Sequence, residues 1–201
     1  MNGRTLRQYS EDSRMPLYIP EIILRKQSHL LPHIVDSLFV AYVSGALTGV
    51  DEPTKERYVK TKEIVERRNG FAYVPHINGT DPVKHPDVTP GDVRDIDEFW
   101  SVSVPDFQIT WVEPSAIGSG IEAGWGEQTW AGTGRRVPII ALHPAAKNVT
   151  RIMRGLKNYA KEIPYESLNH AYESLDRLMA EIEIWSHHER VRYFFEAVQI
   201  L

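Results

Sequence analysis

The sequence predicts an α/β fold: a Rossmann-like parallel sheet flanked by helices, with an N-terminal extension and a C-terminal helical tail. Four short segments are continuously apolar, which is typical of strands covered on both faces of a parallel sheet. Segments whose apolar residues recur at helical spacing alternate with them along the middle of the chain. With 201 residues, 42% of them hydrophobic, the chain is long enough for one domain with a full core.

The sequence of residues 1–35 predicts an N-terminal extension that packs on this domain. Scattered charges and three prolines surround one short apolar patch at 22–24. The arginines near the start are interrupted by Glu11 and Asp12 and are not followed by the apolar stretch of a secretory signal peptide. We therefore expect an extension of the domain rather than a secretory signal.

The four predicted strands are the β-prone segments 38–43, 71–74, 107–112 and 137–142. A helix over 54–69 joins the first two, because an apolar stripe runs among charged residues between Pro53 and Gly70. Strand, helix and strand together form a βαβ unit, which requires the two strands to be parallel.

Two further helices are predicted over 92–104 and 120–131. After Pro164, apolar residues recur at three- and four-residue steps from 168 to 185, which predicts a long amphipathic helix. Its apolar stripe packs either on the core or on another subunit. We divide the chain into an N-terminal extension, a Rossmann-like domain and a C-terminal helical extension, over 1–35, 36–160 and 161–201.

Composition and charge exclude several classes of function. A formal net charge of −4 offers no broad attraction for phosphate backbones, so a nucleic-acid polymer is not an expected partner. The chain has no cysteine, which excludes disulfides and thiolate chemistry and fits a cytoplasmic protein. No apolar run reaches membrane-spanning length, and the eight histidines show no ligand spacing. We expect no membrane association, no metal and no cofactor.

Three segments are expected at the carboxyl ends of the strands, where open α/β sheets bind ligands. Segment 42–49 contains two glycines, which fit either a tight strand exit or a close approach to a ligand. Segment 113–124 places Glu122 in the first turn of a helix, where the helix dipole favours a charged, nucleophilic carboxylate; an ordinary surface glutamate fits as well. The acidic helix with Asp95 and Asp97 either supplies the second carboxylate of glycosidic chemistry or is a solvated face.

Four motifs occur in an order that resembles the nucleoside 2-deoxyribosyltransferase superfamily, and within it the Rcl-like 2'-deoxynucleoside 5'-phosphate N-hydrolases. They are the strand exit at 42–45, the acidic helix before Asp106, the glycine-rich segment 118–124, and segment 149–155. The match covers 39–158, about three fifths of the chain. The resemblance implies that the central domain is a nucleotide N-glycosidase domain.

By this resemblance, Glu122 attacks the anomeric carbon of the sugar and forms a covalent glycosyl-enzyme. A carboxylate also stabilises the oxocarbenium-like transition state of such a reaction. The family places a tyrosine, here Tyr42, next to the nucleophile. Its conserved aspartate, which contacts the sugar and assists the departing base, falls on Asp97 or Asp95, and we prefer Asp97.

The resemblance also implies a binding site for a small-molecule nucleotide or nucleoside. The expected contacts come from the first loop, from the loop before the glutamate, from a position of a neighbouring subunit, and from a histidine near the base: Ser44, Gly45, Ala46, Ser115, Gly118, Ser119, Gly120, Thr150 and His76. For His76, an ordinary loop position fits equally well. Because the Thr150 position acts from a neighbouring subunit in this family, we expect a homo-oligomer, most simply a dimer.

The first loop departs from the Rcl-like pattern. Ala46 and Thr48 stand where that group typically has a serine and an arginine, so a charge-assisted phosphate contact is missing. Three functions therefore remain open: hydrolysis of a nucleoside 5'-monophosphate with ribose or 2'-deoxyribose, transfer of deoxyribose between bases, and nucleotide binding without catalysis.

Overall fold

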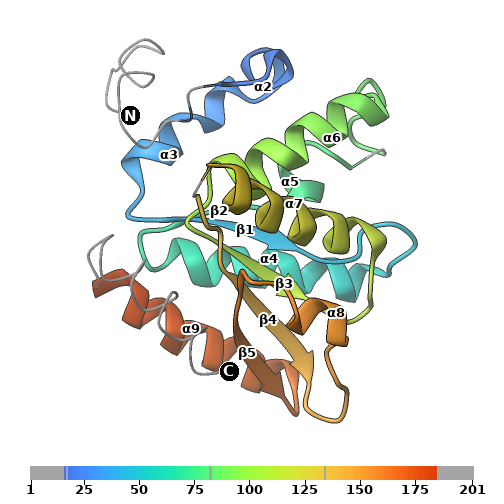
Figure 1. Ribbon diagram of the computed structural model, residues 1–201, viewed down its shortest axis with the longest axis vertical. Helices are drawn as coiled ribbons and strands as arrows, with labels where there is room; N and C mark the ends of the chain where they lie inside the picture. Colours follow the sequence, from blue (N-terminus) through green and yellow to red (C-terminus); the bar gives the residue numbers. More distant parts are fainter. Residues whose placement is uncertain (1–15, 17, 82, 134, 185–201) are drawn as a thin grey trace.

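The structure, a computed structural model, describes residues 16, 18–81, 83–133 and 135–184 (Figure 1). Its centre is a five-stranded parallel sheet in the order β2-β1-β3-β4-β5. The strands are β1 (Val40–Ser44), β2 (Phe71–Tyr73), β3 (Phe107–Trp111), β4 (Ile139–Pro144) and β5 (Tyr159–Tyr165). This arrangement confirms the predicted Rossmann-like α/β class.

Helices precede, connect and follow the strands. They are α2 (Glu21–Lys26), α3 (Pro32–Asp36), α4 (Glu52–Glu66), α5 (Pro75–Asn78), α6 (Pro90–Glu98), α7 (Ile117–Thr133), α8 (Arg151–Arg154) and α9 (Leu168–Ile184), with a 3-10 turn η1 (Ser28–Leu30) and a π-helical turn η2 (Phe99–Ser103). The start of α6 is fixed by a capping box between Thr89 and Asp92. Within the described ranges, no helix is long and apolar enough to cross a membrane.

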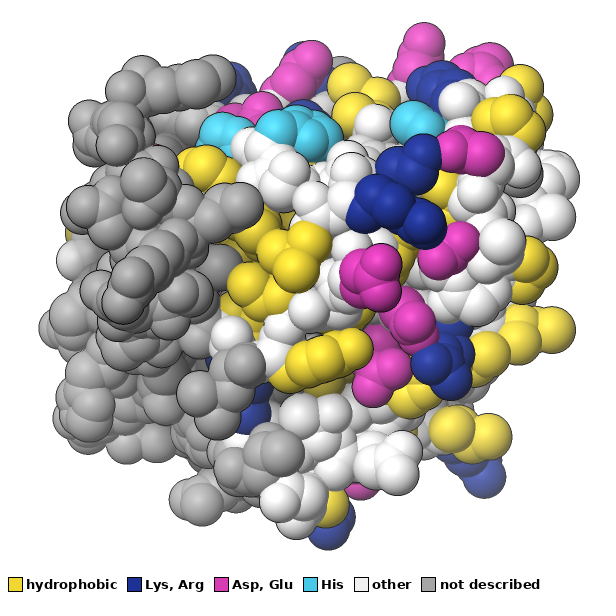
Figure 2. Space-filling model, turned by 90° about the horizontal axis from the view of Figure 1, so that it is seen from above, with side chains coloured by type: hydrophobic (Ala, Val, Ile, Leu, Met, Phe, Trp, Pro, Cys, Tyr) yellow, Lys and Arg dark blue, Asp and Glu magenta, His cyan; other side chains and the backbone are white. Residues whose placement is uncertain are grey.

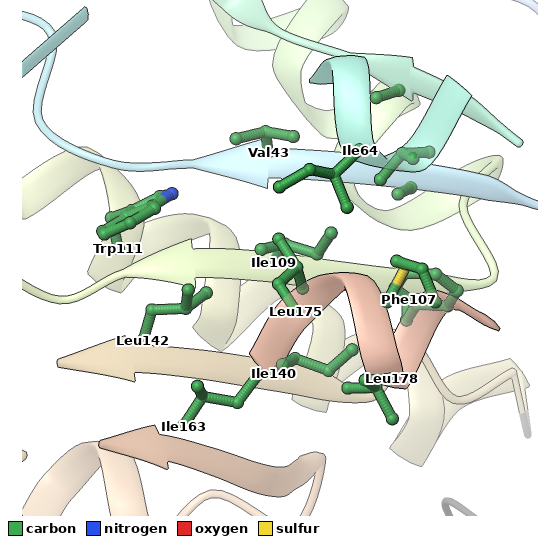
Figure 3. Packing of buried hydrophobic residues seen from close by; sticks show 14 of the residues in the cluster. Val43, Ile64, Phe107, Ile109, Trp111, Ile140, Leu142, Ile163, Leu175 and Leu178 are labelled. Carbon is green, nitrogen blue, oxygen red and sulfur yellow. The ribbon is translucent and has the colours of Figure 1, made fainter. Parts of the chain in front are cut away.

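The two faces of the sheet are covered by different helices (Figure 1). On one face, α4 and α9 pack on alternate strand residues such as Val43, Ile109 and Leu142, and Leu175 of α9 lies over them (Figure 3). On the other face, α6, η2 and the N-terminal helices pack on Tyr42 and its neighbours, while α7 packs further along the sheet. Strands with both faces covered explain the continuous apolar segments of the sequence.

The strand β5 runs from Tyr159 to Tyr165 and therefore crosses the expected domain boundary at residue 160. Its sequence places Lys161, Glu162 and Pro164 among apolar residues, which is tolerated because β5 is an edge strand that pairs only with β4 among the described strands. The apolar stripe of α9 is buried on the sheet of the same chain. The described part of the C-terminal segment, through Ile184, therefore completes the α/β domain, and residues 185–201 of the predicted extension lie outside the described residues.

The described part of the N-terminal extension packs on the domain. Ile23, Leu31 and Ile34 are buried and share a cluster with residues of β1 and β2. This cluster brings α2 next to the acidic helix α6. The extension thus covers the side of the sheet on which Tyr42 lies.

Candidate active site

The site lies where the direction of the sheet reverses. From β1 the chain moves to β2 on one side, and then crosses to β3 on the other side of β1. In open α/β sheets, the carboxyl ends of two such strands form the crevice that binds ligands. Ser44 and Thr110 are register partners at these ends of β1 and β3. Their side chains face α7, because Ile109 and Trp111 on either side of Thr110 belong to the opposite cluster.

Glu122 of α7 points its carboxylate at β1. The Tyr42 hydroxyl donates to Oε1 at 2.8 Å, and the Ser44 hydroxyl donates to Oε2 at 2.5 Å. Tyr42 and Ser44 are two residues apart on one strand, so their side chains share a face of the sheet. Glu122 is only 9% exposed. The structure thus brings three expected site residues into one buried, hydrogen-bonded group.

The helix dipole does not hold the charge of Glu122 as we expected. The helix begins at Ile117, three residues earlier than predicted, so Glu122 lies in its second turn. The effect of the dipole fades within the first turn. Burial raises the pKa of Glu122, and the hydrogen bonds from Ser44 and Tyr42 oppose that rise. Two hydroxyl groups, and not the helix terminus, therefore favour the charged form.

Of the two candidate aspartates, the structure places Asp97 beside Glu122. Burial, together with the charge of Glu122, raises the pKa of Asp97 to about 8. Its Oδ1 is buried and has no hydrogen-bond partner among the described residues. Asp95 instead pairs with Arg94 and lines a separate surface hollow with Tyr18, so it lies on the outer side of α6.

The carboxyl groups of Glu122 and Asp97 have different environments, and this difference favours the ionised form of one over the other. Hydroxyl donors stabilise ionised Glu122, whereas the buried Oδ1 of Asp97 receives no hydrogen bond from the part of the chain that the structure describes. Because two like charges in a buried site disfavour each other, this arrangement favours ionisation of Glu122, which has the two hydroxyl donors, over ionisation of Asp97. A nucleophilic carboxylate and a neutral carboxylic acid are the two groups that glycosidic chemistry requires.

Small side chains let α7 approach the sheet closely. Ser119, Ala123 and Gly126 are buried one helical turn apart, on the same side as Glu122. A Cβ at Gly126 would lie 2.7 Å from the Asn158 amide nitrogen. This close approach accounts for the small side chains at Ser119, Ala123 and Gly126.

In the loop before the glutamate, the expected contacts differ in exposure. Gly118 and Gly120 are exposed, and a Cβ at either would have open space around it. Ser115 is also exposed. Ser119, in contrast, has a buried hydroxyl without a hydrogen-bond partner among the described residues.

In the first loop, packing alone accounts for Gly45. A Cβ at this position would lie 2.5 Å from the Tyr58 ring, and the Tyr58 hydroxyl donates to the Ala46 carbonyl at 2.8 Å. Ala46 is buried. The tight strand exit is thus sufficient to explain this glycine, and close approach to a ligand is not needed for it.

His76 and Thr150 make their contacts with residues other than Glu122. His76 is buried with its ring against Tyr58, at 5.8 Å between centroids, and burial together with Lys84 lowers its pKa. Thr150 caps α8 by accepting a hydrogen bond from the Met153 amide at 3.3 Å. It is exposed, so its hydroxyl is open to a second molecule.

Sequence reasoning missed an aromatic stack behind Tyr42. The Tyr73 ring lies nearly parallel to Tyr42 at 6.0 Å and to Trp100 at 4.6 Å between centroids. The side chain of Gln27 bonds to both Tyr73 and Trp100. No local motif marks these residues, because they come from three separate segments that only the folded sheet brings together.

The face of the molecule that is seen from above the view of Figure 1 carries charges of both signs. Figure 2 shows basic side chains next to acidic ones on this face, with hydrophobic side chains beside them. Within the described ranges, no group of three or more acidic or histidine side chains could hold a metal ion.

A scan of family models and a search of curated proteins give no match to this chain.

Proposed function

We propose that this protein hydrolyses the N-glycosidic bond of a nucleoside 5'-monophosphate through a covalent glycosyl-enzyme on Glu122. The observation that carries the proposal is the pair of unequal carboxyl groups at the switch point of the sheet. Glu122 receives two hydroxyl hydrogen bonds, while Asp97 has a pKa of about 8. This combination fits a nucleophile and a proton donor.

The reaction then takes two displacements. In the first, the Glu122 carboxylate attacks the anomeric carbon, the C–N bond breaks, and Asp97 gives its proton to the departing base. In the second, Asp97 removes a proton from water, the water oxygen attacks the anomeric carbon, and Glu122 leaves as a carboxylate. Two inversions retain the configuration of the sugar.

The 5'-phosphate is assigned to the first turn of α7. Ser119 has a buried hydroxyl without a partner among the described residues, and the free amides of a helix N-terminus attract anions. Ser115 precedes this turn and is exposed. The missing charged contact at Thr48 makes the phosphate contribution smaller than an arginine would allow.

A homodimer is part of the proposal, and its interface does not include the apolar stripe of α9. The apolar stripe of α9 packs on its own sheet and is not available for a subunit contact. The remaining support is the exposed hydroxyl of Thr150 and the exposed isoleucines Ile152 of α8 and Ile117 of α7. Light scattering at micromolar concentration should give a dimer mass, and a monomer with full activity would contradict it.

The deciding experiment incubates the protein with ribo- and deoxyribonucleoside 5'-monophosphates and with the free nucleosides, and detects released base by chromatography. We expect base release from a monophosphate and loss of nearly all turnover in Glu122→Gln, because an amide cannot attack the sugar. An added free base distinguishes transfer from hydrolysis by forming a new nucleoside. Tight nucleotide binding without turnover, unchanged in the variant, would overturn the proposal in favour of a binding module.

A further inference from the structure

Gln27, at the end of α2, makes a buried hydrogen-bonding centre. The Trp100 Nε1–H donates to its Oε1 at 2.6 Å, and its Nε2 donates to the Tyr73 hydroxyl oxygen at 2.8 Å and to the Asn78 carbonyl at 2.9 Å. The side chain is only 2% exposed. Gly79 leaves room for it, since a Cβ there would lie 2.7 Å from Nε2.

The orientation of this amide follows from its partners. An indole N–H only donates, so the atom facing Trp100 must be the amide oxygen. A backbone carbonyl only accepts, so the atom facing Asn78 must be the amide nitrogen. Both hydrogens of Nε2 are then used, and the oxygen of Tyr73 accepts one of them. Gln27 therefore holds the rings of Tyr73 and Trp100 in one arrangement.

The stack connects Gln27 to the nucleophile. Tyr73 is the register partner of Tyr42 on the neighbouring strand, and their rings are within 9° of parallel. The Tyr42 hydroxyl in turn donates to Glu122. Tyr42, Tyr73 and Trp100 are fully buried, so a movement of one ring requires its neighbours to move.

We propose that Gln27 is a positioning residue of the active site: by clamping Tyr73 and Trp100, it holds Tyr42 in place to donate its hydrogen bond to Glu122. The N-terminal segment is then a working part of the site as well as a cover for the sheet. The consequence for catalysis rests on the proposed function. The effect on the Glu122 carboxyl group does not, because it follows from the hydrogen bond alone.

Two variants test the clamp. Gln27→Met keeps the length of the side chain and removes its hydrogen bonds, while Tyr73→Phe keeps the ring and removes the hydroxyl that Gln27 holds. Lys26→Ala is the matched control, because Lys26 is the neighbouring residue and its ion pair with Asp87 is exposed. Tyr73→Phe also decides the question if Gln27→Met fails to fold.

The first readout is a carbon-13 NMR titration of the glutamate carboxyl groups, with the Glu122 signal assigned by its loss in Glu122→Gln. The groups that face Glu122 are Tyr42 and Ser44 from β1 and Asp97 from α6. A weaker bond from Tyr42 destabilises the carboxylate, so both test variants should raise the apparent pKa of Glu122 by about half a unit to one unit. Lys26→Ala should titrate as the wild type does.

The second readout is turnover of whichever nucleotide the wild type hydrolyses. Both test variants should lower kcat about tenfold or more and leave KM within about twofold, because the bound sugar meets a misplaced nucleophile. A lower melting temperature with unchanged titration and kcat would overturn the proposal and leave Gln27 a structural residue. If the wild type hydrolyses no nucleotide, the proposed function fails, and the NMR titration still decides the role of Gln27.

Discussion

At the residue scale, the two hydroxyl groups that contact Glu122 lower the pH at which its carboxyl group ionises. Ser44→Ala removes the donor to Oε2, and hydrogen bonds to charged groups contribute roughly 1.5–3 kcal/mol. The pKa of Glu122 should therefore rise by about one unit or more, and the acid limb of the kcat/KM profile should move to higher pH by the same amount. A rate profile identical in shape to that of the wild type would show that Ser44 does not stabilise the nucleophile.

Because the folded protein retains the proton of Asp97, the free energy of unfolding depends on pH. The pKa of Asp97 is about 8 in the folded protein, whereas the ordinary pKa of an aspartate is 3.8. As the pH rises, the unfolded chain therefore loses this proton at a lower pH than the folded protein does. The wild type should lose stability between about pH 4 and pH 8, by on the order of a few kcal/mol. Asp97→Asn, which is neutral at every pH, should lose less stability over this window.

Urea unfolding at several pH values, with Asp97→Asn and the wild type side by side, measures this difference. The advantage of the variant should grow as the pH rises and be complete above pH 8. Parallel curves for the two proteins would mean that Asp97 is ionised in the folded state. In the proposed reaction, the same variant should also lose turnover, because an amide cannot protonate the departing base.

Part of the site was predictable because its residues occur in short motifs. The strand exit with Tyr42 and Ser44 and the glycine-rich segment before Glu122 are local patterns, and the structure brings them together. The choice between Asp97 and Asp95 depends on which side of α6 faces the sheet. The sequence does not show this, so it gave only a slight preference for Asp97. Gln27 carries no pattern at all, since its partners are 46 and 73 residues away.

At the element scale, two glycines of the same helix should respond in opposite ways. A Cβ at Gly126 would lie 2.7 Å from the Asn158 amide, whereas a Cβ at Gly124 has nothing within 4 Å. Gly126→Ala should therefore destabilise the protein by about 1–3 kcal/mol. Gly124→Ala should stabilise it by up to about 1 kcal/mol, because alanine favours the helix. Thermal unfolding of both variants checks this contrast, and equal shifts in the same direction would refute the close contact of α7 with Asn158.

The elements that sequence reasoning placed best are those with both faces buried. The predicted strands correspond to β1 through β4, whose residues are almost all buried. The missed strand β5 lies at an edge of the sheet and includes the half-buried residues Lys161 and Glu162 and the exposed Pro164. Arg154 bonds Glu162 through two contacts, at 2.6 and 3.0 Å, so this charge is satisfied within the sheet edge. Such a strand has no continuous apolar run to reveal it.

At the scale of the whole molecule, the domain requires its C-terminal part. Eight of the 21 buried residues of the larger core cluster come from β5 and α9, including Ile163, Leu175 and Leu178 (Figure 3). A chain that ends at residue 158 lacks these elements and exposes the apolar face of β4. We expect this shorter chain to be insoluble or to unfold without a cooperative thermal transition. A chain that ends at residue 184 should be soluble and should unfold cooperatively. Circular dichroism of the two truncated chains measures the difference. A cooperative transition in the shorter chain would show that the folded domain ends near residue 160.

The strand order also has a consequence for synthesis on the ribosome. The Tyr42–Glu122 bond joins residues 80 apart, so a nascent chain that has emerged only through β3 already contains Tyr42 and Ser44 but still lacks their carboxylate partner. At that stage β3 is the outer strand on its side, and Ile109 and Trp111 have neither β4 beside them nor α9 above them. An unpaired apolar strand edge invites pairing with other chains. We therefore expect the nascent chain to be most prone to such pairing between the emergence of β3 and that of β5.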